Sequence, residues 1–328
     1  MRKRVRGDRI YYFFDTGEKP RREISLGTDF IFALGKYAQL AVVAGQIKNV
    51  VFGDAIRRYL AEELPKLSEN TQHTYGSDIK HVLAFFATAP LDQMRPMHID
   101  QFIMRHRDTP TTANRCKRLV SAIWNHARKW GYTDLPNPCA GIKGHSLGKR
   151  TAYITDAIFS AVYACASETL RDAMDLAYLT GQRPADTMRM TEHDIIDGRL
   201  IVTQAKTQQP LRIVISGELF ALIERIRVRK AAHKIVTAAL LTNTNGKRLT
   251  APVLRNHFEA ARELAAEANP EMSADILKFH FYDLRAKAAD DTSDERGEQA
   301  ASDLLGHESV KTTQRHYFRR GKIVAPTR

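Results

Sequence analysis

The stretch that decides the fold lies toward the C-terminus and reads Tyr282-Asp283-Leu284-Arg285, Leu304-Leu305-Gly306-His307 and Thr312-Thr313-Gln314-Arg315-His316-Tyr317. Gly306 after two leucines predicts a left-handed turn that ends one helix, with His307 opening the next segment. Tyr317 stands ten residues after His307 (317 minus 307), and no other tyrosine follows that histidine. An arginine, an imidazole and a phenol in this order point to chemistry at a phosphate group.

A second arginine lies upstream, in Thr180-Gly181-Gln182-Arg183-Pro184-Ala185-Asp186. A reaction at a phosphate group requires a nucleophile, cations on the non-bridging oxygens and an acid for the departing oxygen. Arginine suits the second task because its planar fork grips phosphate bidentately and stays charged. We therefore expect Arg183 and Arg285 to be the phosphate-binding cations.

Between the two arginine motifs, strand patterns at residues 200–206 and 211–215 flank Thr207-Gln208-Gln209-Pro210, which predicts a hairpin with Lys206 at its turn end. A lone lysine there is weak evidence for function. Asp186 follows Arg183 by three residues, and a carboxylate near the start of a helix is also favoured by the helix dipole.

Taken together, these motifs resemble the tyrosine recombinase (phage integrase) family, over residues 47 to 320. The resemblance implies that Tyr317 attacks DNA and that Lys206 protonates the leaving 5′-oxygen. It further implies that Asp186 buttresses Arg183. The cations and donors that would stabilise the transition state are Arg183, Arg285 and His307.

The main departure from the family is Tyr282, which stands where the resemblance leads us to expect histidine. A phenol can hydrogen-bond a phosphate oxygen, but it accepts a proton less readily than imidazole at neutral pH. Either Tyr282 keeps a positional role in the site or His280 takes part. We favour Tyr282, because His280 lies five residues before Arg285 instead of three.

Composition agrees with a DNA partner. The 328 residues hold 50 Lys and Arg against 37 Asp and Glu, a net charge of +13, which draws a protein to polyanions. Three separated cysteines predict reduced thiols, and neither a signal peptide nor a membrane span is evident. We expect a cytoplasmic, nucleoid-associated protein without metal or other cofactor.

The predicted fold is mainly α with a small β component. Residues 1–46 form a β appendage, with strands at 9–14 and 22–26, and a connecting helix from near Asp29. Residues 47–146 form a helical core-binding domain with helices over 52–64, 69–86, 95–105 and 112–130, the second capped by Ser68 or Asn70. Residues 147–328 form a mixed α/β catalytic domain.

Basic residues mark three possible DNA contacts. Residues 1–22 carry eight Lys or Arg (2, 3, 4, 6, 9, 19, 21 and 22) against three acids, which suggests accessory DNA binding. The second is the fourth core-binding helix, with Arg115, Lys117 and Arg118. The third is the Gly- and Pro-rich linker at 136–150, with Lys149 and Arg150.

The resulting expectation is an integrase of a prophage or other mobile element that cuts and rejoins double-stranded DNA through a 3′-phosphotyrosine. Such recombination implies a homotetramer on two duplexes, with host or phage DNA-bending proteins as candidate accessory partners. Two alternatives stay open: a DNA-binding relative impaired in catalysis, for which Tyr282 is the argument, and a nicking-closing enzyme of the type IB topoisomerase kind.

Overall fold

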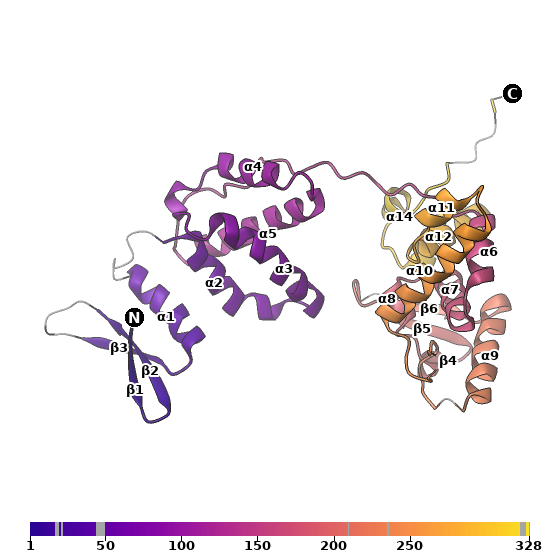
Figure 1. Cartoon of the computed structure of the whole chain (residues 1–328), viewed down its shortest axis with the longest axis horizontal. Helices are drawn as coiled ribbons and strands as arrows, with labels where there is room; N and C mark the ends of the chain where they lie inside the picture. Colours follow the sequence, from indigo (N-terminus) through magenta and orange to yellow (C-terminus); the bar gives the residue numbers. More distant parts are fainter. Residues whose placement is uncertain are drawn as a thin grey trace. The chain divides into compact units, whose positions relative to one another are not determined.

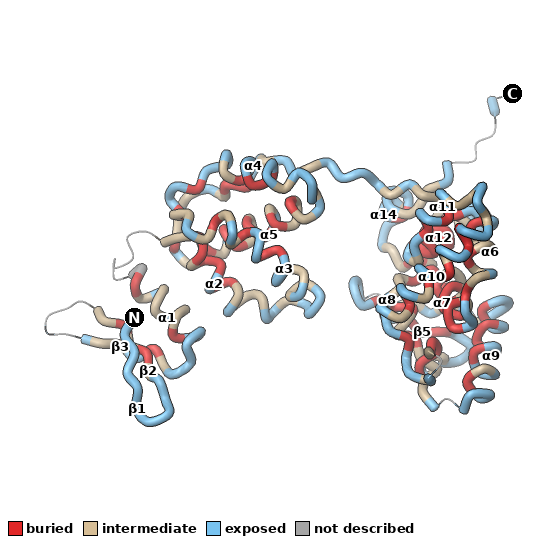
Figure 2. The backbone as a smooth tube through the Cα atoms, in the orientation of Figure 1, coloured by how far each residue is buried: buried red, intermediate tan, exposed pale blue. Residues whose placement is uncertain are grey.

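The computed structural model describes residues 1–16, 20, 22–43, 50–208, 210–234, 236–243, 245–321 and 326–327. The chain divides into two compact units, Met1–Lys149 and Arg150–Arg328 (Figure 1). Each unit has its own buried core, visible as the red segments of the tube in Figure 2. The boundary between the two units falls inside the linker that the sequence indicates.

The first unit begins with an antiparallel sheet of order β1-β2-β3, formed by Arg2–Arg6, Arg9–Asp15 and Glu23–Gly27. Helix α1 (Phe30–Val43) covers it, and Phe14, Leu26 and Ala33 are buried between them. The two predicted strands are confirmed. Strand β1 was not predicted, because all five of its residues are exposed and no apolar alternation marks them. Residues 17–19 and 21, between the two predicted strands, lie outside the described residues.

The four predicted core-binding helices are confirmed as α2 (Phe52–Glu62), α3 (Glu69–Phe86), α4 (Pro96–Arg105) and α5 (Pro110–Lys129), with the short turns η1 (Leu64–Lys66) and η2 (Leu91–Gln93) between them. They enclose an aromatic core in which Phe52, Phe86 and Trp124 are fully buried. Ser68 occupies the N-cap position of α3, but its hydroxyl pairs with that of Thr71 at 2.9 Å and makes no cap hydrogen bond. The expected side-chain cap is therefore wrong.

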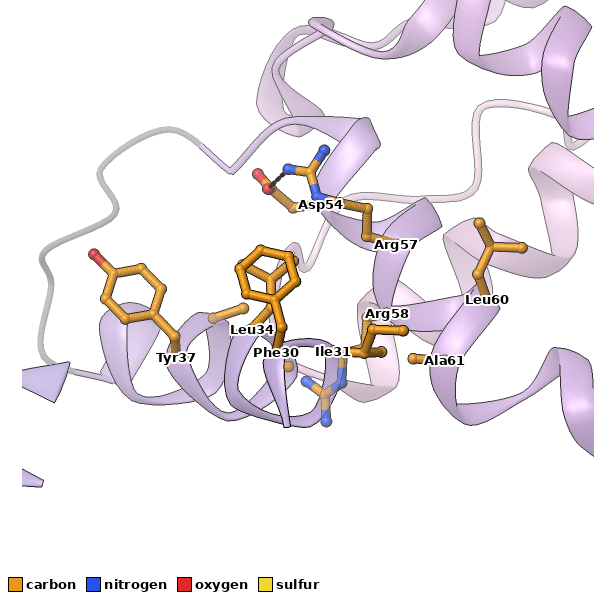
Figure 3. Close-up of a pocket in the computed structure, with 11 residues that line it drawn as sticks. Phe30, Ile31, Leu34, Tyr37, Asp54, Arg57, Arg58, Leu60 and Ala61 are labelled. Carbon is orange, nitrogen blue, oxygen red and sulfur yellow. Dashed lines mark hydrogen bonds and ion pairs between the residues drawn. The ribbon is translucent and has the colours of Figure 1, made fainter. Parts of the chain in front are cut away.

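Helices α1 and α2 leave a hollow of about 420 Å³ between them. Phe30, Ile31 and Leu34 of α1 face Leu60 and Ala61 of α2 across it, with the Asp54–Arg57 ion pair at its edge (Figure 3). The hollow is mostly apolar. It contains none of the residues for which the sequence predicts catalysis.

Much of the linker is fastened to the helical bundle. The backbone N–H of His145 donates to Asn114 Oδ1, and the Asn114 amide donates back to the His145 carbonyl, both at 2.8 Å. A Cβ on Gly144 would lie 2.3 Å from Asn114 Oδ1, so only glycine permits this approach. The linker was predicted to span residues 136–150. The part of it without such hydrogen bonds to the bundle is shorter than that range, and Arg150 at its end already belongs to the second unit.

The second unit is helical around a small sheet. Its α-helices are α6 (Asp156–Cys165), α7 (Glu168–Thr180), α8 (Pro184–Thr187), α9 (Gly217–Ala232), α10 (Ala251–Ala268), α11 (Ser273–Lys278), α12 (Asp283–Arg296), α13 (Glu298–Leu305) and α14 (Val310–His316). The sheet has the order β4-β5-β6, from Ile195–Ile196, Arg199–Thr203 and Pro210–Val214, and the 3-10 turn η3 (Glu192–Asp194) precedes it. Buried residues of α7, including Met174 and Leu176, lie in its core.

The predicted hairpin is confirmed as β5 and β6, although β5 ends at Thr203 and residues 205–207 form the turn. The strand stops early because the Gln208 N–H donates to the Gln204 carbonyl at 2.8 Å, which closes the turn. Lys206 therefore lies in the turn and not on the strand.

Candidate active site

Two helix ends that meet inside the second unit form the base of the site. Gly181 is the C-cap of α7 and Gly306 that of α13, with φ of 63° and 66°, the left-handed conformation that favours glycine. A Cβ on Gly181 would lie 3.1 Å from Leu304 Cγ, and one on Gly306 would lie 2.9 Å from Gln204 Nε2. Glycine is thus needed at both positions for conformation and for close packing.

Arg285 is held between these two helix ends. Its Nη1 donates to the Gly181 carbonyl at 2.7 Å and its Nη2 to the Leu305 carbonyl at 2.8 Å, where the helix dipoles favour a cation. The residue is 3% exposed, and burial lowers the pKa of its guanidinium, while the neighbouring Tyr317 opposes that shift. The two carbonyls fix the orientation of the arginine fork.

Arg183 stands at the N-cap of α8 with its side chain 22% exposed. Its Nη1 donates to Gln204 Oε1 at 2.9 Å and lies 3.9 Å from Asp186 Oδ2. Asp186 is buried, and its Oδ1 accepts a hydrogen bond from the Ala205 N–H at 2.9 Å. Asp186 therefore lies beside Arg183 and also anchors the turn that carries Lys206, an arrangement that suits the predicted buttress.

Gln204 connects the two halves of the site, a role that the sequence did not indicate. Its buried Nε2 donates to Gln182 Oε1 at 2.7 Å and to the Leu305 carbonyl at 2.8 Å, while Oε1 accepts from Arg183. Gln182 in turn donates to the Leu304 carbonyl at 2.9 Å. The only sequence signal for this network is the position of Gln182 next to Arg183.

His307 contacts both Arg285 and α14. The Arg285 Nη2 lies 3.2 Å from His307 Nε2, and His307 Nδ1 lies 2.8 Å from Thr313 Oγ1. Because a guanidinium can only donate, Nε2 is the acceptor and Nδ1 carries the hydrogen. Burial, followed by the charges of Arg285, Arg183 and His316, lowers the pKa of His307 to about 4. The imidazole is thus neutral at neutral pH.

Tyr317 follows α14 directly, and its N–H donates to the Thr313 carbonyl at 2.9 Å. The centre of its ring lies 5.0 Å from that of His307 and 5.1 Å from the Arg285 guanidinium carbon. Helix α14, which begins at Val310, spans most of the chain between His307 and Tyr317. The structure thus brings Arg183, Arg285, His307 and Tyr317 together through a continuous set of contacts, with Lys206 exposed on the adjoining turn.

Tyr282 lies at the N-cap of α12 and is 47% exposed, so it is not a core residue. Its ring stacks on His280, with centroids 5.5 Å apart and an interplanar angle of 9°, and the Arg150 guanidinium lies 5.2 Å from its centre. Burial raises the pKa of Tyr282 and lowers that of His280. Tyr282 and His280, the two alternatives that the sequence left open, therefore form one aromatic stack.

Three of the five basic residues predicted to contact DNA have partners within the protein. Arg115 pairs bidentately with the fully buried Asp78, at 2.7 and 3.0 Å. Lys117 donates to the Ile142 carbonyl and Arg150 to Asp283. Arg118 and Lys149 are exposed.

The cysteines Cys116, Cys139 and Cys165 are all free thiols, and burial raises the pKa of the first two to about 12. In the part of the chain that the structure describes, no group of three His, Cys, Asp or Glu side chains is arranged to hold a metal ion. No helix among the described residues is long and apolar enough to cross a membrane.

Comparison with known proteins shows the family of this chain. The phage integrase family model matches residues 153–322, and the model for the phage integrase N-terminal SAM-like domain matches residues 51–106. The integrases of Enterobacteria phage 434 and Escherichia phage lambda are 25% and 24% identical to this chain, over 78% of it and 72% of each relative.

Solved structures show the same fold. A lambda integrase dimer bound to a COC′ core site aligns with a TM-score of 0.73 at 21% identity, over 99% of this chain and 97% of the other. A lambda integrase tetramer bound to a Holliday junction gives 0.72 over the same shares. A Tn1549 transposon integrase in complex with transposon right end DNA gives 0.68 at 14% identity, over 83% of this chain and 96% of the other.

The second unit is thus a tyrosine recombinase catalytic domain. Since the family match covers more than half of the chain, the protein belongs to the phage integrase family, and it is a site-specific recombinase that acts on DNA.

Proposed function

We propose that this recombinase cuts DNA by attack of Tyr317 on the scissile phosphate and that it serves as the integrase of a prophage or other mobile element. The observation that carries the proposal is the meeting of Tyr317, His307 and Arg285 around one point, with ring and guanidinium centres about 5 Å apart. A covalent intermediate divides one difficult exchange into two easier steps.

The step balances without an external energy source. The phenol proton of Tyr317 passes to water, and a bond forms between Tyr317 Oη and phosphorus while the bond from phosphorus to the 5′-oxygen breaks. The products are a 3′-phosphotyrosine and, after Lys206 supplies a proton, a free 5′-hydroxyl. A 5′-hydroxyl from a partner duplex then reverses the reaction and exchanges strands.

The fixed cations stabilise the charge that develops on the phosphate. Arg285 is pre-oriented by two carbonyls and Arg183 by Gln204, so neither reorganises during the reaction. His307 can donate to a phosphate oxygen only when Nε2 carries a proton. The negative charge of a bound phosphate favours that protonation, which the neighbouring arginines oppose in free protein.

The proposed partners are double-stranded DNA and three further copies of the chain. The lambda integrase tetramer on a Holliday junction supports a homotetramer that joins two duplexes. DNA-bending accessory proteins of host or phage would complete the complex. We place the protein in the cytoplasm on the nucleoid, where its DNA substrate lies.

The decisive experiment incubates the purified protein with a nicked suicide substrate built from the chromosomal sequence that flanks its gene. Wild-type protein should form a covalent adduct, and Tyr317→Phe should form none while binding DNA with nearly unchanged affinity, because only the hydroxyl is lost. Mapping the linked peptide identifies the nucleophile. An adduct at another tyrosine would refute the assignment, and relaxation of supercoils without strand exchange would favour a nicking-closing enzyme.

A further inference from the structure

A buried carboxylate outside the phosphate-binding set holds the segment that follows Tyr317. Asp283 is fully buried, and its oxygens accept from Arg319 Nη1 at 2.6 Å, Arg150 Nε at 2.8 Å and the His280 N–H at 2.8 Å. It lies two residues before Arg285 on α12, about 200° away around the helix. One helix thus presents a phosphate-binding arginine and, from another side, an anchor for two further arginines.

Arg319 is fixed at both its side chain and its backbone. Its side chain is 8% exposed, and Nη1 donates also to the Ala152 carbonyl at 2.7 Å. Its backbone N–H donates to both oxygens of buried Asp290, at 3.1 and 3.2 Å. An ion pair with a fully buried carboxylate is costly to break, because it leaves a buried charge with fewer partners.

Tyr317 is two residues from this anchor, and two residues of chain reach at most about 7 Å. On its other side, Tyr317 is tied to Thr313, whose hydroxyl contacts His307. The nucleophile is therefore held from both directions along the chain. Arg320 provides a contrast, since it pairs with Asp294 at 2.5 Å while 39% exposed, and such surface pairs contribute little.

We propose that Arg319, locked by Asp283 and Asp290, is a positioning residue that sets the location of Tyr317 relative to Arg285 and His307. This inference rests on the proposed function, because it takes Tyr317 to be the nucleophile. The same carboxylate binds Arg150, so the start of the catalytic unit and the nucleophile segment share one anchor.

A positioning role predicts a particular kinetic signature. Misplacing a reacting atom by about 1 Å can cost roughly a hundredfold in rate without any loss of binding. Arg319→Ala should therefore lower the single-turnover rate of adduct formation at saturating DNA by about ten- to a hundredfold. The Kd for the same DNA should stay within about twofold, since the cationic phosphate ligands are untouched.

The experiment compares Arg319→Ala, Arg319→Lys and the matched surface variant Arg320→Ala with wild type. Lysine retains a cation for Asp283 and should recover part of the rate, while Arg320→Ala should cleave within about twofold of wild type. Each protein is assayed for adduct rate, Kd and Tm. If Arg319→Ala fails to fold, the lysine variant decides, with a reduced rate and an unchanged Kd expected.

Wild-type cleavage rates in Arg319→Ala, or in Arg319→Lys where alanine does not fold, would overturn the inference. If the affinity for DNA falls by as large a factor as the cleavage rate, the role of Arg319 is merely structural and the inference is overturned too. Tyr317→Phe is run in parallel: an adduct in that variant, or none in wild type, defeats the proposed function instead.

Discussion

At the scale of single residues, His307 illustrates how burial sets protonation. Its pKa falls from 6.5 to about 4 in the folded protein, so between these values the unfolded chain binds more protons. Stability from this residue is therefore complete above about pH 6.5 and is lost as pH falls toward 4. We expect the Tm of His307→Gln to decrease less than that of wild type when pH is lowered from 7 to 4.

Asp290 provides the opposite sign as a control for that titration. Burial raises its pKa from 3.8 to about 6, so its contribution is complete below about pH 3.8 and is lost as pH rises through 6. Asp290→Asn should therefore steepen the loss of Tm on acidification. If Tm falls with pH equally in both variants and in wild type, neither His307 nor Asp290 titrates as the structure implies.

Tyr282 is the residue at which the resemblance to the family led us to expect histidine. If its phenol is a positional hydrogen-bond partner of the bound phosphate, Tyr282→Phe should slow cleavage about ten- to a hundredfold, as expected from losing a bond of roughly 1.5–3 kcal/mol to a charged group. Tyr282→His should retain substantial cleavage.

Single-turnover rates of the two Tyr282 variants, measured with melting temperatures, test this role. Because the side chain is 47% exposed, neither substitution should change Tm greatly. A Phe variant that cleaves at the wild-type rate would remove Tyr282 from the active site.

At the scale of elements, the turn between β5 and β6 carries Lys206, the proposed acid. Lys206→Ala should slow cleavage of ordinary DNA by about 10²- to 10⁴-fold, the usual effect of losing a general acid. A substrate with sulfur in place of the bridging 5′-oxygen should restore much of that rate, because a thiolate leaves without a proton.

The control for this rescue is Arg183→Ala. This variant loses the positive charge proposed to stabilise the non-bridging oxygens but keeps Lys206, the proposed acid. The Arg183→Ala variant should cleave slowly on both ordinary DNA and the sulfur-containing substrate, as measured by single-turnover adduct formation. Equal rescue of the two variants, or none for Lys206→Ala, would assign the proton to another group.

At the scale of the whole molecule, the basic N-terminal sheet belongs to the first unit, whereas the predicted catalytic residues belong to the second. Arg2 and Arg4 form ion pairs with Asp15 and Glu23, while Lys3 and Arg6 are exposed on β1. Deleting residues 1–46 should weaken binding to accessory DNA more than it slows cleavage of a core-site suicide substrate.

Gel-shift affinities for long flanking DNA, set against single-turnover rates on the core site, measure the effect of this deletion. The salt dependence of binding should also fall, because fewer phosphates are neutralised. If both activities fall equally, the N-terminal sheet is a structural part of the protein.

The sequence by itself determined the four core-binding helices, the hairpin and the order of the arginine, histidine and tyrosine motifs. These follow from local properties: apolar periodicity, glycine at helix ends, and residue types that suit phosphate chemistry. Strand β1 escaped prediction because its side chains are all exposed.

Only the tertiary structure decided which groups meet. Gln204 contacts Leu305 across 101 residues and Asp283 contacts Arg150 across 133, and no local pattern encodes such pairs. It also decided the protonation of His307 and the engagement of Arg115 with Asp78. The physical reason is that desolvation and charge depend on neighbours in space, which the chain brings together only on folding.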